Sequence, residues 1–131
     1  MKKLNLIVPA ALLAFALQAP AQFDHDRYAP RSVNALVDRV HSDLDHAYNA
    51  WHFTGGDRNR LNKAEKELRD FASKWDRGKF DKGELDDAIS AVQHVLDNNH
   101  LPEMDRNALS ADATELRNMR EAYDRHEIGR W

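Results

Sequence analysis

Apolar side chains recur at intervals of three and four residues between positions 32 and 52. This stripe comprises Val33, Leu36, Val37, Val40, Leu44, Ala47, Tyr48 and Trp51. Such spacing puts every member on one face of an α-helix, which completes a turn in about 3.6 residues. The sequence therefore predicts an amphipathic helix over residues 32–52, with Ser32 as its N-cap and the glycine pair of FTGGD after its end.

Three more stripes of the same kind follow and predict helices over residues 57–77, 81–98 and 103–126. They comprise Leu61, Ala64, Leu68, Phe71 and Trp75; Leu85, Ala88, Ile89, Val92, Val95 and Leu96; and Leu109, Ala113, Leu116, Met119 and Tyr123. No stretch alternates apolar and polar residues over the length of a strand. Short loops between helices of similar length favour antiparallel neighbours. We therefore expect an all-α domain over residues 32–128, folded as an antiparallel up-down four-helix bundle.

The amino-terminal segment has the pattern of a bacterial secretory signal peptide. Two lysines precede an apolar run over residues 4–17, and Ala19 and Ala21 form the small-x-small pattern of a cleavage site. The run is shorter than the roughly 20 residues that a stable membrane span needs. We expect cleavage after Ala21, a short flexible arm over residues 22–31, and a periplasmic or secreted protein.

Charge and cysteine content narrow the possible functions. Loss of residues 1–21 removes two of the 19 basic residues and none of the 22 acidic ones, which changes the net charge from −3 to −5. A mildly acidic chain has no general attraction to nucleic acid. The chain contains no cysteine, so disulfides, thiolate metal sites and covalently attached haem are excluded. No cofactor is predicted.

Residues 73–89, SKWDRGKFDKGELDDAI, resemble the second half of a calcium-binding EF-hand loop. With Gly78 at loop position 6 and Glu84 at position 12, the oxygen-ligand positions 1, 3 and 5 hold serine, tryptophan and arginine. The alternative is a corner between two helices, in which Gly78 ends one helix and Asp81 caps the next. The ligand count favours the corner, with Phe80 packed under the turn.

Seven histidines raise the possibility of a metal site. On the first helix, His41 and Asp45 are one turn apart, and Asp43 and His46 form a second such pair. Pairs of this kind provide two ligands of a zinc or copper site, and the others would have to come from another helix. The sequence makes His41, Asp45 and His46 the candidate ligands; the alternative is a solvated polar helix edge.

No motif of an enzyme is recognisable. The chain has neither a strand-turn-helix context for a nucleophilic serine nor a glycine-rich phosphate loop. Phe53 and Trp131 are candidate interaction residues, because aromatic side chains are common at interface hot spots. We therefore expect a non-enzymatic binding or accessory protein of the cell envelope, acting on a protein or small ligand that the sequence does not specify. The alternative is a periplasmic metal-binding protein that uses the His/Asp pairs of the first helix.

Overall fold

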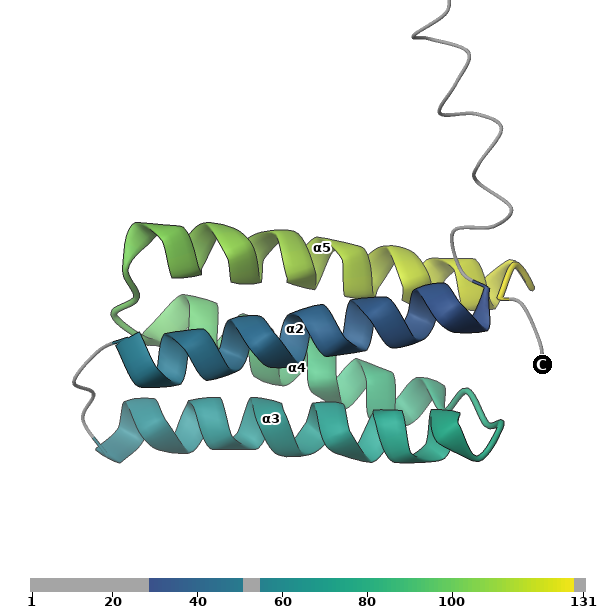
Figure 1. Cartoon of the computed structure of the whole chain (residues 1–131), viewed down its shortest axis with the longest axis horizontal. Helices are drawn as coiled ribbons and strands as arrows, with labels where there is room; N and C mark the ends of the chain where they lie inside the picture. The colour runs from purple at the N-terminus through teal and green to yellow at the C-terminus, as the bar shows by residue number, and fades with distance from the viewer. Residues whose placement is uncertain (1–28, 51–54, 129–131) are drawn as a thin grey trace, which may run out of the picture.

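A computed structural model describes residues 29–50 and 55–128 of the chain (Figure 1). All the regular structure in these two segments is helical. The helices are α2 (Pro30–Ala50), α3 (Gly55–Asp76), α4 (Lys82–Asn98) and α5 (Glu103–Asp124). The segment interpreted as a signal peptide, most of the arm, Phe53 and Trp131 lie outside the described residues. Helix α2 begins at Pro30, so Ser32, which the sequence suggested as the N-cap, lies in its first turn.

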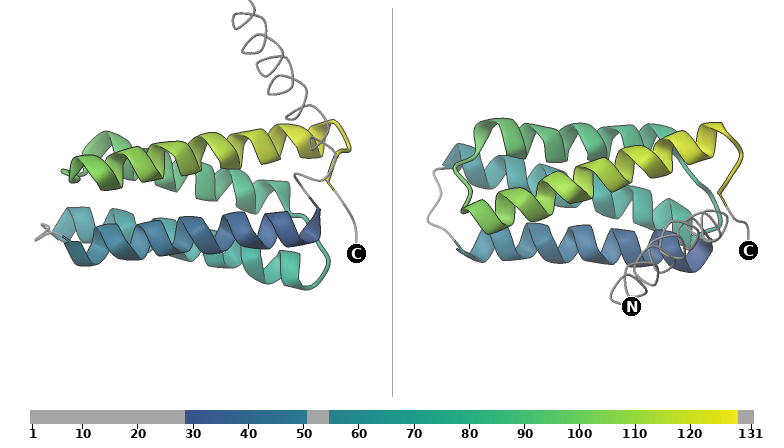
Figure 2. Two further views of the ribbon diagram at one scale, coloured as in Figure 1. Left: turned by 45° about the horizontal axis from the view of Figure 1, so that its top comes forward. Right: turned by 90° about the horizontal axis from the view of Figure 1, so that it is seen from above.

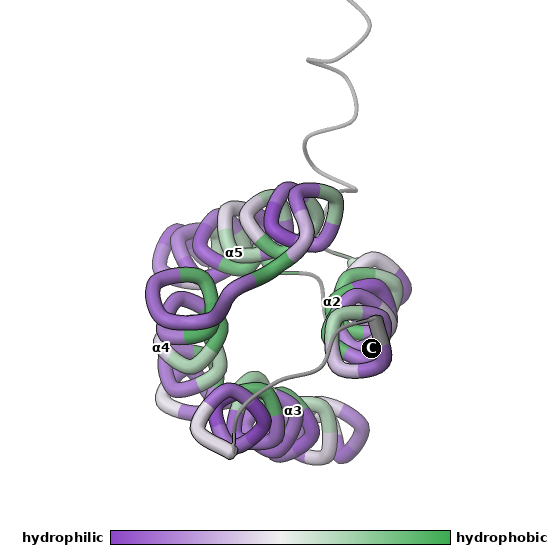
Figure 3. The backbone as a smooth tube through the Cα atoms, turned by 90° about the vertical axis from the view of Figure 1, so that its left-hand side faces the viewer, coloured by the Kyte–Doolittle hydropathy of each residue, from purple (hydrophilic) through white to green (hydrophobic). Residues whose placement is uncertain are grey.

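The four helices pack around one apolar interior. Helix α2 contacts α3 and α5, and α4 contacts the same two helices on the other side, as Figures 2 and 3 show. In the end view of Figure 3 each helix carries its hydrophobic positions on the side that faces the others. Leu68, Phe71, Val92 and Leu116 are at most 1% exposed. The prediction of an all-helical bundle built from these stripes is confirmed.

Helix α2, like α4, contributes a purely aliphatic surface to the core. Its buried side chains are aliphatic, with Val33, Val40 and Leu44 fully enclosed. The prediction that Tyr48 belongs to this stripe is wrong, because its side chain is 37% exposed. The aromatic residues of the core come instead from α3, α5 and the α3–α4 corner.

The end of α3 is a Schellman motif. Gly78 has a φ of 84°, in the left-handed region that favours glycine. Its N–H donates to the carbonyl of Trp75 (2.8 Å), and the N–H of Lys79 donates to the carbonyl of Lys74 (2.9 Å). These two bonds satisfy carbonyls that the end of a helix would otherwise leave without donors.

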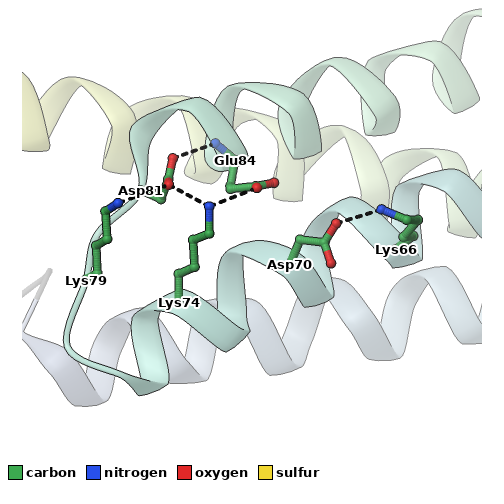
Figure 4. A network of polar contacts seen from close by, with 6 residues as sticks. All are labelled: Lys66, Asp70, Lys74, Lys79, Asp81 and Glu84. Carbon is green, nitrogen blue, oxygen red and sulfur yellow. Dashed lines mark hydrogen bonds and ion pairs between the residues drawn. The ribbon is translucent and has the colours of Figure 1, made fainter.

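The start of α4 is capped by Asp81 (Figure 4). Its Oδ1 accepts a hydrogen bond from the backbone N–H of Glu84 (3.0 Å), and its Oδ2 lies 2.9 Å from Nζ of Lys74. These contacts, the bond from Lys74 first, lower the pKa of Asp81 to about 2. The Glu84 carboxylate accepts from the same Lys74 ammonium at 3.1 Å. The contacts of a helix corner thus account for the residues that resembled an EF-hand loop.

Phe80, in the connection between Gly78 and Asp81, joins three parts of the bundle. Its ring meets Phe71 edge-on with centroids 5.2 Å apart and Trp75 edge-on at 5.9 Å. It stacks on Tyr123 of α5 at 4.5 Å. Edge and offset-stacked contacts of this kind add to the stabilisation that burial alone gives. The aromatic cluster of these four residues therefore ties α3, the corner and α5 together.

Substitution of Gly78 by alanine should lower the free energy of unfolding by about 1–2 kcal/mol, because the new Cβ is forced into the left-handed region. Urea unfolding followed by tryptophan fluorescence measures the difference. Gly55→Ala is the matched control: it opens α3, and a Cβ there would meet no atom within 4 Å. That variant should stay within about 0.5 kcal/mol of the wild type. Equal losses in both variants would contradict the Schellman geometry.

Candidate metal centre between helices α2 and α3

Three side chains from two helices meet at the edge where α2 lies along α3. His41 and Asp45 are one turn apart on α2, and Glu65 projects from α3. Nδ1 of His41 lies 2.6 Å from Oε2 of Glu65, and Nε2 of His41 lies 3.8 Å from Oδ2 of Asp45. One potential ligand atom from each residue falls within 4.8 Å of the other two. The structure thus brings two of the three ligands that the sequence suggested together with a third from a neighbouring helix.

Glu65 is the buried member of this trio. The residue is 8% exposed, and its Oε1 atom is buried without a hydrogen-bond partner. Burial first, and then the neighbouring Asp45 carboxyl, raise the pKa of Glu65 to about 7, because the Arg69 guanidinium, 4.0 Å from Oε2, offsets only part of their effect. The site therefore disfavours the negative charge that Glu65 would carry unless a cation neutralises it.

An open pocket of about 490 Å³ gives access to the trio. Tyr48, Asn62 and Arg69 line it together with the three candidate ligands. One imidazole nitrogen and two carboxylate oxygens form a mixed donor set of the kind that binds Zn²⁺ and its transition-metal neighbours. Calcium and magnesium prefer oxygen ligands alone. Three protein ligands would leave at least one coordination position facing the pocket.

The structure places His46, the third ligand suggested by the sequence, on the opposite edge of α2. There its Nδ1 lies 2.6 Å from Oδ1 of Asp105 on α5, a residue that is 5% exposed. Further along the same edge, Nε of Arg39 donates to Oδ1 of Asp112 at 3.0 Å. The two edges of α2 thus carry separate polar clusters, and His46 does not join His41 and Asp45.

A second cluster of acidic side chains, on α3 and α4, differs from the α2–α3 trio in its chemistry. Glu67, Glu84 and Asp87 offer three oxygens within 4.8 Å of one another. None of the three is classed among the buried residues, and Glu84 already accepts from the Lys74 ammonium. Two half-buried carboxylates and an exposed one, with a lysine already bonded to Glu84, have no unsatisfied buried oxygen, so this group does not compete with the α2–α3 trio as a candidate centre.

Comparison with known proteins gives no match. No protein-family model, no curated protein and no solved structure resembles the chain closely enough to be matched to it. In the part of the chain that the structure describes, no helix is both long and apolar enough to cross a membrane. The geometry of the α2–α3 trio is therefore the feature of the molecule that points to a function.

Proposed function

We propose that the protein binds a divalent transition-metal ion, with Zn²⁺ as the representative, between α2 and α3. The observation that supports this is the convergence of His41, Asp45 and Glu65, whose ligand atoms lie within 4.8 Å of one another. Ligands about 2.0–2.1 Å from a tetrahedral ion are roughly 3.3 Å apart, so small side-chain rotations suffice to close the site. The ion would replace the hydrogen bond between His41 and Glu65.

The alternative is a polar helix edge whose groups only hydrogen-bond one another. The pair of His46 and Asp105 fits that description, because one imidazole meets one carboxylate at 2.6 Å. On the α3 edge one imidazole faces two carboxylates, and when Glu65 is ionised its Oε1 receives no hydrogen bond. A buried polar atom without a partner is destabilising. A divalent cation supplies both the missing positive charge and a partner for that oxygen.

The setting of this proposal is a periplasmic or secreted accessory protein without enzymatic activity. The amino-terminal pattern of residues 1–21 supports secretion through a cleaved signal peptide. The proposal also includes an antiparallel up-down order of the helices, supported by the short connections at residues 77–81 and 99–102. A metal-binding role and an accessory role are compatible, since the fold alone fixes neither.

Calorimetric titration with ZnCl₂, CuCl₂ and CaCl₂ tests the proposal. We expect one zinc or copper ion to bind per chain and calcium to bind much more weakly, because one ligand is a nitrogen. His41→Ala should weaken zinc binding by at least 10-fold, since losing a ligand or its orienting partner typically has effects of this size.

His46→Ala is the matched control for that titration. It removes an imidazole that is also 2.6 Å from a carboxylate, and it lies on the same helix, but on the α5 edge. It should leave the zinc affinity within about 3-fold of the wild type, a free-energy difference of less than 1 kcal/mol. An equal loss in both variants, or no binding of zinc or copper to the wild type, would refute the site.

A further inference from the structure

Of the four helices, α2 makes the least extensive contact with its neighbours. The aromatic cluster of Phe71, Trp75, Phe80 and Tyr123 joins α3, the corner and α5, and α4 starts directly after that corner. Among the described residues, the buried faces of α2 and α4 both offer aliphatic and alanine side chains alone, but α4 packs far more extensively against α3 than α2 does. Aromatic residues bury more area per side chain than these do. The apolar contacts that retain α2 are therefore the less extensive ones.

Polar pairs on both edges of α2 fix its position. His41 meets Glu65 on the α3 edge, and Arg39 meets Asp112 on the α5 edge. Both carboxyl groups are buried, and when they are ionised one oxygen of each, Oε1 of Glu65 and Oδ2 of Asp112, receives no hydrogen bond; when protonated, each shares its proton with a carboxylate of α2, Asp45 or Asp43. Separation of α2 would return both oxygens to water. The free-energy cost of burying these oxygens therefore opposes the docking of α2.

We propose that the metal ion acts as a latch, a bound ion that keeps α2 docked on the unit formed by α3, α4 and α5. This inference rests on the proposed metal binding at His41, Asp45 and Glu65. The first two ligands belong to α2 and the third to α3, so the complete ligand set exists only while the two helices are in contact. A ligand that binds one state better than another shifts the equilibrium toward that state. Zinc should therefore lower the population of chains in which α2 has separated.

Hydrogen exchange measured by mass spectrometry on the purified chain tests the latch. Without metal, amides in residues 36–46 of α2 should exchange faster than those in residues 88–96 of α4, because α2 opens on its own. If zinc binds only while α2 is docked, ZnCl₂ at 100 times its dissociation constant reduces the population of the separated state about 100-fold. Zinc that stays bound to His41 and Asp45 after α2 separates would reduce this effect. We therefore expect zinc to slow amide exchange in α2 by about 10- to 100-fold. The α4 segment should change much less.

Two variants separate the latch from metal binding itself. Glu65→Gln removes the ligand on α3 and leaves the α2 pair intact, so zinc should still bind weakly but no longer slow exchange in α2. His46→Ala should keep the slowing. Far-UV circular dichroism checks that both variants are folded.

The outcomes are distinct. Zinc that binds in calorimetry but slows α2 and α4 equally, or slows α2 as much in the Glu65→Gln variant as in the wild type, refutes the latch and leaves the metal site standing. Equal exchange of α2 and α4 without metal also refutes it. No zinc binding refutes the metal site and the latch together.

Discussion

Replacement of Phe71 by alanine is expected to lower the free energy of unfolding by about 3–5 kcal/mol, the range found when a buried aromatic side chain is truncated. Phe71 is fully buried and meets Phe80 edge-on at 5.2 Å. The substitution would leave a cavity beside Phe80, whose ring also stacks on Tyr123 of α5. The loss should therefore weaken the association of α3, the corner and α5 at once. Urea unfolding followed by circular dichroism measures it.

Two further variants calibrate that measurement. Phe71→Leu keeps most of the volume and should lose clearly less than Phe71→Ala, about 1–2 kcal/mol. Met104→Ala removes a side chain of comparable size that is 81% exposed, and it should change the stability by less than about 0.5 kcal/mol. A loss below about 1.5 kcal/mol for Phe71→Ala would mean that the aromatic cluster is not the centre of the core.

The spacing of apolar residues was sufficient to predict the four helices and most of the core. A buried helix face must be apolar, so its period appears directly in the sequence. The α3–α4 corner was predictable for a similar reason, because a left-handed helix end requires Gly78 and a helix start favours Asp81. These features depend on residues close together in the chain.

Buried acids are the part of the core that the apolar pattern missed. Asp105 and Asp112 are 5% and 1% exposed, although both are charged residue types. They occupy the same three- and four-residue intervals as Leu109 and Leu116, in the order 105, 109, 112, 116. A search for acids in register with the stripe would have found them. Their partners, His46 and Arg39, lie on a helix distant in sequence and could not be identified from spacing.

Of the candidate metal centre, only the two ligands that lie on one helix were predictable from the sequence. His41 and Asp45 are one turn apart on one helix, and this follows from the sequence. In the sequence Glu65 lies one turn before Arg69, a spacing typical of a surface ion pair, and nothing there marks it as a ligand. Its burial depends on the rotation of α3 against α2, which is set by packing between distant segments. The third ligand therefore required the tertiary structure.

Asp112→Asn should make the protein more stable than the wild type, by a margin that is smaller at pH 5 than at pH 8. Burial first, and then Asp43 beside it, raise the pKa of Asp112 from 3.8 to about 7, although Arg39 acts in the opposite direction. Between pH 3.8 and about pH 7, Asp112 keeps its proton in the folded state and has lost it in the unfolded state. The free energy of unfolding therefore falls as the pH rises toward 7 and levels off above it.

The asparagine imitates the protonated acid. Its oxygen can accept from Nε of Arg39, as Oδ1 of Asp112 does at 3.0 Å, and its NH₂ group can donate to the Asp43 carboxylate. At about 1.36 kcal/mol per pKa unit, the stability difference between variant and wild type should grow by about 2–3 kcal/mol from pH 5 to pH 8. Glu65 titrates in both proteins, so its contribution cancels.

Urea unfolding at pH 5, 6, 7 and 8 measures this difference, with Asp38→Asn, an exposed position on α2, as the control that should show no such trend. A difference that is constant with pH would mean that Asp112 is ionised throughout, with Arg39 outweighing the effects of burial and of Asp43. In that event the α5 edge would hold α2 by an ordinary ion pair. A difference that grows as expected would show that α2 is docked against a carboxyl group that favours its neutral form.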